Sequence, residues 1–563
     1  MNSVNQNFSR LSQFLDIEKI DIHSVIYYGI GIGVISLATP VAVQALVNSI
    51  AFGALFQPLL VLTMILLFLV GFSNVLAALQ FYVVDMLQRR LFVRLFDATT
   101  QRLLDVSLGA RDKVYLPELV NRFLDVVTLQ KTMAVLLLEA VGYVLQTLIG
   151  MLLLAFYHPL LLAFDLVLIA LIAFVLFVLG KGGMATAVAQ SKAKYEALAW
   201  LEGIAATPML NGSRSNRVFL LQQAEAIARQ YLLAAADHFR ILSRQNVGAL
   251  TVHALANTAL LGLGGWMVIE RQLSLGQLIA AELVVSAMIY GLTRLGKTLD
   301  SFYEMMASMD KLSYLLDLPQ NSETKSSLHS DSITHISNPE PYQLDLVNLS
   351  LPKSLHWDHL EEINYTVPSG ARIAINGGID KGSLFDLILG LRSPASGYIC
   401  INQVDIRDIN LRALRDHIVL VREPELITGS IHDNLSLGRS LDIDELNQAL
   451  AAVGLRELVS ALPDGSNTIL AQDGQPLSFE ECVRLSLARA IASKPSVLML
   501  DKILDRLPAL PASVILEYLV RPEHAWTLVL ATDNPGLIAL CERHIVFEKG
   551  KLVEIVQMQR EGL

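Results

Sequence analysis

Residues 24–84 contain no Asp, Glu, Lys or Arg. A membrane-spanning helix needs about 20 consecutive apolar residues, so a run of this length predicts two spans. Because backbone polar groups find no water inside a bilayer, such spans have to be helical. Only 17% of the whole chain is charged, compared with about 25% in ordinary soluble domains. The sequence therefore predicts an integral membrane protein.

Four more apolar stretches follow, which gives six predicted spans. Two long segments, 86–132 and 181–246, carry most of the Lys and Arg residues near the spans, while the other connections are short. The positive-inside rule places these long segments and both termini in the cytosol. The predicted spans are 26–50, 58–84, 139–157, 160–180, 247–269 and 275–292.

The remaining segments have different compositions. Residues 1–23 are amphipathic and predict either a helix on the membrane surface or a leader packed on the first span. Residues 317–343 are rich in Ser, Asn and Pro without periodicity, which is typical of a linker. We expect the membrane domain over 24–316, a cytosolic domain over 344–557, and a short tail over 558–563.

Charge and cysteine content narrow the classes of partner and cofactor. The net charge of −10 gives no reason to expect a nucleic-acid partner. The three cysteines lie far apart without the spacing of a metal site, so we expect reduced thiols and no bound metal.

Residues 477–505 carry the most informative pattern of the cytosolic region. Apolar spacing predicts a helix over 480–492, and a short apolar run predicts a buried strand over 497–500 that ends in Asp501. The segment LSFEECVRLSLARA lines up without a gap with LSGGQ-x-Q-R-x-x-L-A-R-A, and this part of the chain resembles the signature helix and Walker B strand of an ATP-binding cassette. The matching residues are Arg484, Leu487, Ala488, Arg489 and Ala490.

Six spans followed by such a cassette resemble a type I ABC exporter half-transporter. The resemblance implies an α-helical transmembrane domain with long cytosolic helical extensions, followed by an α/β P-loop-type nucleotide-binding domain. It also implies a dimer embedded in membrane lipid. We expect a homodimer in a bacterial inner (cytoplasmic) membrane, with a heterodimer with another half-transporter as the alternative.

The phosphate-binding loop departs from its family pattern. A functional P-loop reads G-x-x-x-x-G-K-[ST], in which backbone N–H groups wrap the phosphates and the hydroxyl holds Mg²⁺. If Lys381 is the P-loop lysine, Asp380 replaces a motif glycine, and Gly382 stands at the hydroxyl position with Ser383 one residue late. The degenerate loop comprises Gly377, Gly378, Asp380, Lys381, Gly382 and Ser383.

The other positions that contact ATP in this family are altered too. By the resemblance, Arg422 stands at the Q-loop glutamine, Lys502 at the catalytic glutamate and Asp533 at the switch histidine, while Asp501 keeps the Walker B acid. Phosphoryl transfer depends on positioned charge and metal, so we expect no ATP hydrolysis by this chain alone. The signature positions are Ser478, Phe479, Glu480 and Glu481, where a ring and an acid replace two glycines.

Three functional readings follow from these departures. The first is a transport subunit of the ABC exporter class whose cassette no longer hydrolyses ATP. The second is a regulatory or scaffolding membrane subunit that moves no cargo, and the third is a weak ATPase with an altered site. ATP and Mg²⁺ are expected as cofactors only if the altered site still binds them.

Two further predictions concern single side chains. Acids inside spans are costly and often functional, so Asp165 and Glu282 are candidates for a cargo path, with pairing to an amide of another helix as the alternative. A lysine beside an acid in a partly buried site favours a charged pair. We therefore expect Lys502 to form an ion pair with Asp501 or Asp533.

Overall fold

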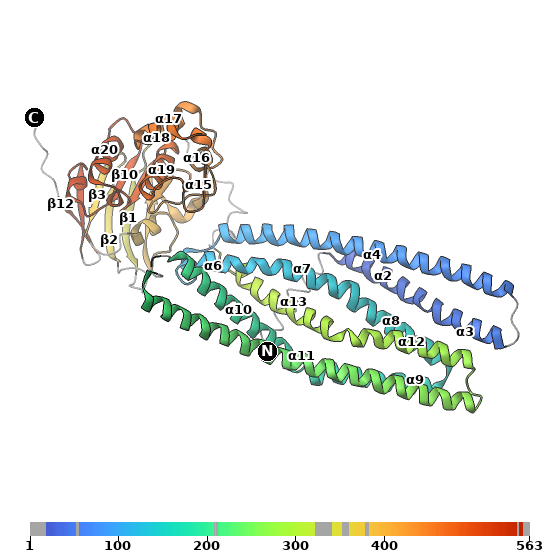
Figure 1. Ribbon diagram of the computed structural model, residues 1–563. Helices are drawn as coiled ribbons and strands as arrows, with labels where there is room; N and C mark the ends of the chain where they lie inside the picture. Colours follow the sequence, from blue (N-terminus) through green and yellow to red (C-terminus); the bar gives the residue numbers. More distant parts are fainter. Residues whose placement is uncertain are drawn as a thin grey trace, which may run out of the picture. The chain divides into compact units, whose positions relative to one another are not determined.

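The computed structural model describes residues 18–51, 56–207, 209, 212–320, 340–351, 360–377, 382–548 and 551–555. The chain divides into two compact units, which are treated separately below. The first contains residues 1–104 and 114–318, and the second contains residues 105–113 and 319–563. Figure 1 shows that the first unit is built of long helices and the second of sheets and shorter helices.

The described part of the first unit is entirely helical. Its longest members, α4 (Phe56–Leu104) and α11 (Arg214–Ile269), each combine an apolar half with a polar continuation. The other helices are α2 (Lys19–Ser36), α3 (Ala38–Ala51), α6 (Leu116–Val120), η1 (Asn121–Leu124), α7 (Asp125–Val135), η2 (Leu136–Ala140), α8 (Val141–Tyr157), α9 (Pro159–Ala173), η3 (Phe174–Leu179), α10 (Gly183–Ala206), α12 (Leu275–Thr293) and α13 (Leu295–Leu316).

Among the described residues, five helical segments are long and apolar enough to cross a membrane, and each contains or closely overlaps one of the first five predicted spans. The sixth predicted span coincides with α12, whose apolar part, Leu275–Met288, is shorter. The five segments are Lys19–Ser49, Leu59–Leu104, Leu116–Tyr157, Pro159–Leu179 and Arg214–Ile269.

Several apolar clusters hold the described part of this unit together, and two of them are the largest. One joins α8, α9, α11 and α12 through residues such as Leu154, Leu168 and Leu260, all nearly inaccessible. The other joins α4, α7 and α13 in the polar continuation, where Leu95 and Met306 lie in its centre. Burial of apolar surface at about 25 cal/mol per Å² stabilises helix contacts outside the bilayer, so this second cluster orders the helices beyond the spans.

The second unit contains a six-stranded sheet in the order β12-β11-β3-β10-β9-β6. All its neighbours are parallel except the edge strand β12, which pairs antiparallel with β11. The strands are β3 (Arg372–Asn376), β6 (Ile418–Val421), β9 (Val497–Asp501), β10 (Thr527–Ala531), β11 (Arg543–Glu548) and β12 (Lys551–Ile555). β9 and β10 are buried throughout, as expected of central parallel strands covered on both faces.

Two smaller sheets complete this unit. An antiparallel sheet has the order β2-β1-β4-β5, and a short ribbon pairs β7 with β8. Their strands are β1 (Leu344–Leu351), β2 (Leu360–Val367), β4 (Ser396–Ile401), β5 (Val404–Asp405), β7 (Gly429–Ser430) and β8 (Ile469–Leu470).

Helices of the second unit include a short one from the segment between α4 and α6. This helix, α5 (Leu108–Arg111), lies in the segment Asp105–Lys113 that packs with the second unit. The others are α14 (Gly382–Ile388), η6 (Ile406–Asp408), α15 (Leu411–Leu414), α16 (Ile431–Ser436), α17 (Ile443–Ala452), α18 (Arg456–Ala461), η7 (Gly465–Asn467), α19 (Phe479–Ala492), η8 (Leu504–Arg506), α20 (Ala509–Leu519) and α21 (Pro535–Ile538).

Element bounds differ from the sequence-based expectations by a few residues. Of the predicted segment 1–23, residues 1–17 lie outside the described residues, and Lys19 already begins the helix of the first span. Tyr342, placed in the linker by composition, is buried against the second unit, while residues 321–339 of the linker lie outside the described residues. The predicted helix over 480–492 is α19, and the predicted strand over 497–500 is β9.

Candidate functional site

The order of the parallel sheet brings four separate segments to one edge. β3, β10, β9 and β6 are consecutive neighbours, so the residues that follow them meet at their carboxyl ends. In open α/β sheets this edge is where ligands bind. The segments that meet there begin with Gly377 after β3, Asp533 two residues after β10, Lys502 after β9 and Arg422 after β6.

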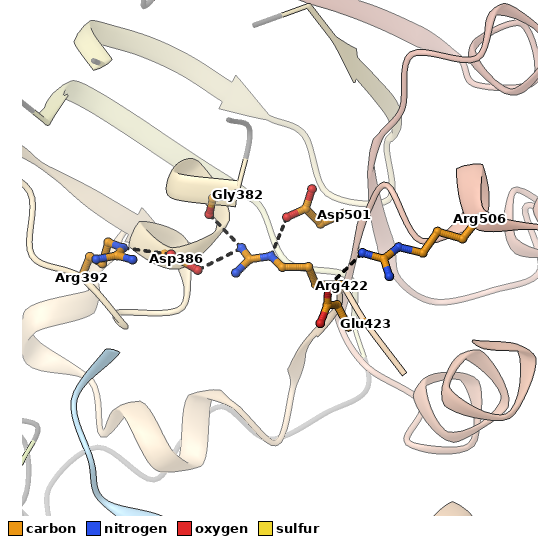
Figure 2. A network of polar contacts seen from close by, with 7 residues as sticks. All are labelled: Gly382, Asp386, Arg392, Arg422, Glu423, Asp501 and Arg506. Atoms are coloured by element: carbon orange, nitrogen blue, oxygen red, sulfur yellow. Dashed lines mark hydrogen bonds and ion pairs between the residues drawn. The ribbon is translucent and has the colours of Figure 1, made fainter. Parts of the chain in front are cut away.

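Arg422 is the centre of the polar contacts at this edge. Its Nε donates to Oδ2 of Asp501 over 2.6 Å. Its Nη2 donates to Oδ1 of Asp386 and to the carbonyl oxygen of Gly382, each over 3.0 Å. Figure 2 shows the guanidinium lying between the two carboxylates. The residue predicted at the Q-loop glutamine position, Arg422, therefore binds the acid predicted for Walker B, Asp501.

Asp386 extends these contacts to a second arginine. Its Oδ2 lies 2.9 Å from Nε of Arg392, and Nη1 of Arg392 lies 2.8 Å from Oδ2 of Asp112. Asp112 belongs to the segment Asp105–Lys113 of the same unit. The result is an alternating chain of acids and arginines, which we call the Arg422 network: Asp112, Arg392, Asp386, Arg422 and Asp501.

Both arginines of the network remain charged. Burial works to lower the pKa of Arg422, but Asp386 and Asp501 outweigh it and the pKa lies above its ordinary value. Burial likewise opposes the charge on Arg392, while Asp112 and Asp386 raise the pKa of that guanidinium. Buried charges are tolerated when they are paired and hydrogen-bonded, and the fork of a guanidinium meets carboxylates with good geometry.

Lys502 pairs with Asp533, one of the two acids that the sequence predicts for it. Its Nζ lies 3.6 Å from Oδ2 of Asp533. The other carboxylate oxygen of Asp533 accepts a hydrogen bond from the backbone N–H of Gly377 over 3.2 Å. Gly377 has φ +74°, and a Cβ there would lie 2.7 Å from the carbonyl oxygen of Phe547. A glycine is therefore required at this entry to the degenerate P-loop.

The rest of that loop is described only in part. Gly378, Asp380 and Lys381 lie outside the described residues, so their predicted roles stay predictions. Gly382 and Ser383 form the first turn of α14 and are both buried. No side-chain oxygen exists at Gly382, which is the aligned metal-hydroxyl position.

The signature residues begin α19, where each polar side chain has a local partner. Ser478 is the N-cap: its hydroxyl accepts from the backbone N–H of Glu481, whose carboxylate accepts from the backbone N–H of Ser478. This reciprocal capping box stabilises a helix start. Glu480 pairs with Arg484 at 2.9 Å, and the ring of Phe479 is exposed. The acids thus support the helix itself.

The two acids predicted inside the spans differ in burial. Asp165 of α9 is 2% exposed, and neither of its carboxylate oxygens has a hydrogen-bond partner among the described residues. Glu282 of α12 is half-buried, and its Oε2 has none in the same part of the chain. Within the described residues, Asp165 lacks the amide partner that was the alternative to a cargo-path role.

Sequence reasoning missed Asp386 and Arg392. The available signal for Asp386 was an acid inside the otherwise apolar run Leu384–Ile388, four residues after the altered metal-hydroxyl position. A carboxylate there is buried once α14 covers the sheet, so it requires a cation as a partner. No sequence signal identified which of the nearby arginines would supply it.

Comparison with known proteins agrees with this architecture. Residues 25–204 match the ABC transporter transmembrane region, and residues 360–504 match the ABC transporter family of cassettes. The solved structure of a bacterial Atm1-family ABC exporter with ATP bound superposes with a TM-score of 0.81. It covers 96% of this chain and 95% of that chain, at 18% sequence identity, so this likeness establishes the fold.

Curated relatives match over shorter lengths. ABC transporter B family member 29 of Arabidopsis thaliana, a chloroplastic protein, is 32% identical over 202 residues, which is 35% of this chain and 32% of the relative. The exotoxin translocation ATP-binding protein PaxB of Pasteurella aerogenes is 27% identical over 326 residues, which is 56% of this chain and 44% of the relative. The chain thus spans less than half the length of these relatives.

The fold and the two matched regions define an integral membrane protein in which a helical transmembrane domain is fused to an α/β nucleotide-binding domain. Within that class, residues 25–204 are similar to the ABC transporter transmembrane region and residues 360–504 to the ABC transporter domain, and the fold is that of an ABC exporter. The fold class expected from the sequence is confirmed.

A cassette of this family implies ATP, usually with Mg²⁺, and the residues at this edge do not fit the metal ion. Mg²⁺ requires near-octahedral oxygen ligands at about 2.0–2.1 Å. Here one oxygen of Asp501 is bound by Arg422, and Gly382 offers no hydroxyl. Among the described residues no group of three or more His, Cys, Asp and Glu side chains is placed to hold a metal ion.

Proposed function

We propose that this chain is a membrane transport subunit of the ABC exporter class whose cassette has lost ATP hydrolysis. The observation that carries the proposal is the ion pair between Lys502 and Asp533. These residues stand where the family has the glutamate that activates water and the switch histidine. A lysine at this position supplies no carboxylate to take a proton from water, and its side chain is paired with Asp533 instead.

The dimer belongs to the same proposal. In this family each ATP site combines one chain's P-loop and Walker B strand with the other chain's signature. Both halves are altered here, because Arg422 binds Asp501 in one half and Phe479 and Glu480 replace glycines in the other. Pairing with an intact chain would leave each site with one altered half. A homodimer, the commonest symmetric assembly, is therefore our proposal, in a bacterial inner membrane with both termini cytosolic.

For the cargo, the chain offers one structural indication, which concerns its path through the membrane domain. Asp165 and Glu282 are proposed to line it. Among the described residues, neither carboxylate oxygen of the buried Asp165 has a hydrogen-bond partner, and Oε2 of the half-buried Glu282 has none. Acids inside spans are costly and often functional. No observation favours the scaffolding alternative over transport, and the match to exporter domains over both units supports transport.

The test is ATP turnover by the purified protein reconstituted in lipid vesicles with Mg²⁺. We expect no phosphate release above that of protein-free vesicles, in wild type and in Asp501→Asn alike. A turnover of about 1 s⁻¹, within the ordinary enzyme range, that disappears in Asp501→Asn would contradict the proposal. Light scattering of the detergent-solubilised protein, without nucleotide, is expected to give the mass of two chains.

A further inference from the structure

We infer that Arg422 replaces the divalent metal ion of this cassette and closes a latent divalent-cation site formed by Asp386 and Asp501. This inference deepens the proposed function, because it identifies what occupies the metal position of the inactive cassette. The two can fail separately. Wild type could bind a metal ion without hydrolysing ATP, or bind none and still show turnover.

The position of the guanidinium supports this assignment. By the resemblance to the cassette motifs, three positions belong to the metal ion: the hydroxyl position, the Q-loop and the Walker B acid. Here they are Gly382, Arg422 and Asp501. Arg422 contacts both of the others, over 3.0 Å to the carbonyl oxygen of Gly382 and 2.6 Å to Asp501. A permanently charged group thus lies where these three segments converge (Figure 2).

Asp386 supplies a second buried carboxylate at the position of Arg422, in addition to Asp501. It is 4% exposed, and Asp501 is 7% exposed. Arg422 is the group that connects these two buried carboxylates, through Nη2 and Nε. Without it, two nearly buried negative charges would face one space, with Arg392 beside Asp386 as the remaining counter-charge. Such a pair of carboxylates is the oxygen-rich, negatively charged arrangement that hard divalent cations prefer.

Arg422 is held firmly enough to exclude a competing ion. Its donors are used in three contacts, and Asp386 is fixed from its other side by Arg392, which is itself paired with Asp112 at 2.8 Å. Removal of one member of a buried ion pair leaves an uncompensated charge, which is strongly unfavourable. Displacement of Arg422 by Mg²⁺ would also require the ion to give up part of its water shell, which it does reluctantly.

The experiment measures metal binding by the full-length protein in detergent, without nucleotide. The probe is Mn²⁺, whose binding is measured by electron paramagnetic resonance. The unfolding temperature is then measured with and without Mg²⁺. The variants are Arg422→Gln, the double variant Arg422→Gln/Asp501→Asn, and Arg506→Gln. The last is a matched control, because Arg506 pairs with Glu423 at 2.9 Å and its side chain is as exposed as that of Arg422, at 38%.

We expect wild type and Arg506→Gln to bind no Mn²⁺ in the micromolar range. Arg422→Gln is expected to gain one Mn²⁺ per chain, bound about tenfold or more tightly than in wild type, and the double variant to lose it. Mg²⁺ is expected to raise the unfolding temperature of Arg422→Gln alone. If Arg422→Gln is unfolded without metal, recovery of a cooperative transition on adding Mg²⁺ supports the inference, and continued absence of that transition overturns it.

Two further results would overturn the inference. One is stoichiometric Mn²⁺ binding by wild type that Asp501→Asn abolishes, because the metal would then fit beside Arg422. The other is a folded Arg422→Gln variant that binds Mn²⁺ no better than wild type, because the two carboxylates would then not form a site.

Discussion

Lys502 Nζ and Asp533 Oδ2 lie 3.6 Å apart at the ends of the neighbouring parallel strands β9 and β10. The backbone contributes to this approach, since Lys502 has φ +53° and its N–H donates to the carbonyl oxygen of Ala531 over 2.9 Å. Asp533 in turn accepts from Gly377 at the start of the degenerate P-loop. The pair thus ties three segments together where the family has catalytic groups.

Restoring the family glutamate at Lys502 should not restore activity. Lys502→Glu loses the pair and places a negative charge close to Asp533, so we expect stability to fall by about 0.2–1 kcal/mol, the range of exposed ion pairs. ATP turnover should stay absent, because Arg422 still binds Asp501. Thermal unfolding and phosphate release measure the two effects. Lys551→Glu, on the exposed edge strand β12, is the charge-matched control, and turnover in Lys502→Glu would contradict this prediction.

Mg-ATP is expected to leave the unfolding temperature unchanged. A ligand at about 100 times its Kd adds about 2.7 kcal/mol to the stability of the state that binds it, which a thermal titration detects readily. The altered loop and the Arg422 network are our reasons to expect no such shift at millimolar Mg-ATP. A clear rise in wild type that is lost in Lys381→Ala would show that the P-loop still binds nucleotide.

The outer end of the Arg422 network should contribute to stability. Asp112→Asn removes the charge that faces Arg392 at 2.8 Å, and Arg392 then keeps Asp386 as its acidic partner in the network. We expect a loss of about 1.5–3 kcal/mol, the range of hydrogen bonds to charged groups, measured by thermal unfolding. The control is Asp237→Asn, whose pair with Arg240 is exposed on both sides, and for which we expect little change. Equal effects of the two variants would argue against a buried network.

His524 should make the protein less stable in acid. Its ring stacks on Trp526 with centroids 4.3 Å apart, and burial lowers the pKa of His524 below its ordinary value. The folded state therefore favours the neutral ring. The stabilisation from the neutral ring is fully present above the pKa of His524 in the unfolded chain, about 6.5. It is lost as the pH falls through that value towards the lowered pKa of the folded state.

The comparison that isolates this effect uses His524→Phe, which keeps an aromatic ring without a titrating group. When the pH is lowered from about 8 to about 5.5, the unfolding temperature of the wild type should fall further than that of the variant. An identical decrease in both proteins would mean that other groups cause the acid sensitivity.

Local pattern was sufficient to predict much of the fold. Span length and lack of charge depend on the sequence window alone, so the stretch 24–84 predicted membrane helices that the structure contains. The signature helix and Walker B strand followed from apolar spacing, and α19 and β9 lie within a residue of the expected bounds. Short links and helix ends were less well predicted, because capping and packing shift them by a turn or less.

The sequence by itself determined which chemical groups the cassette carries, and its motifs predict a lysine for a glutamate at Lys502, an aspartate for a histidine at Asp533, and an arginine for a glutamine at Arg422. Only the tertiary structure decided what these groups contact. Asp386 and Arg422 are far apart in the chain. They meet because β3 and β6 belong to one parallel sheet, so that α14, which follows β3, and Arg422, which follows β6, lie at the same edge. Ion pairing acts over a few ångströms of space. Which distant residues come within that range depends on the assembled sheet and cannot be read from the local sequence pattern.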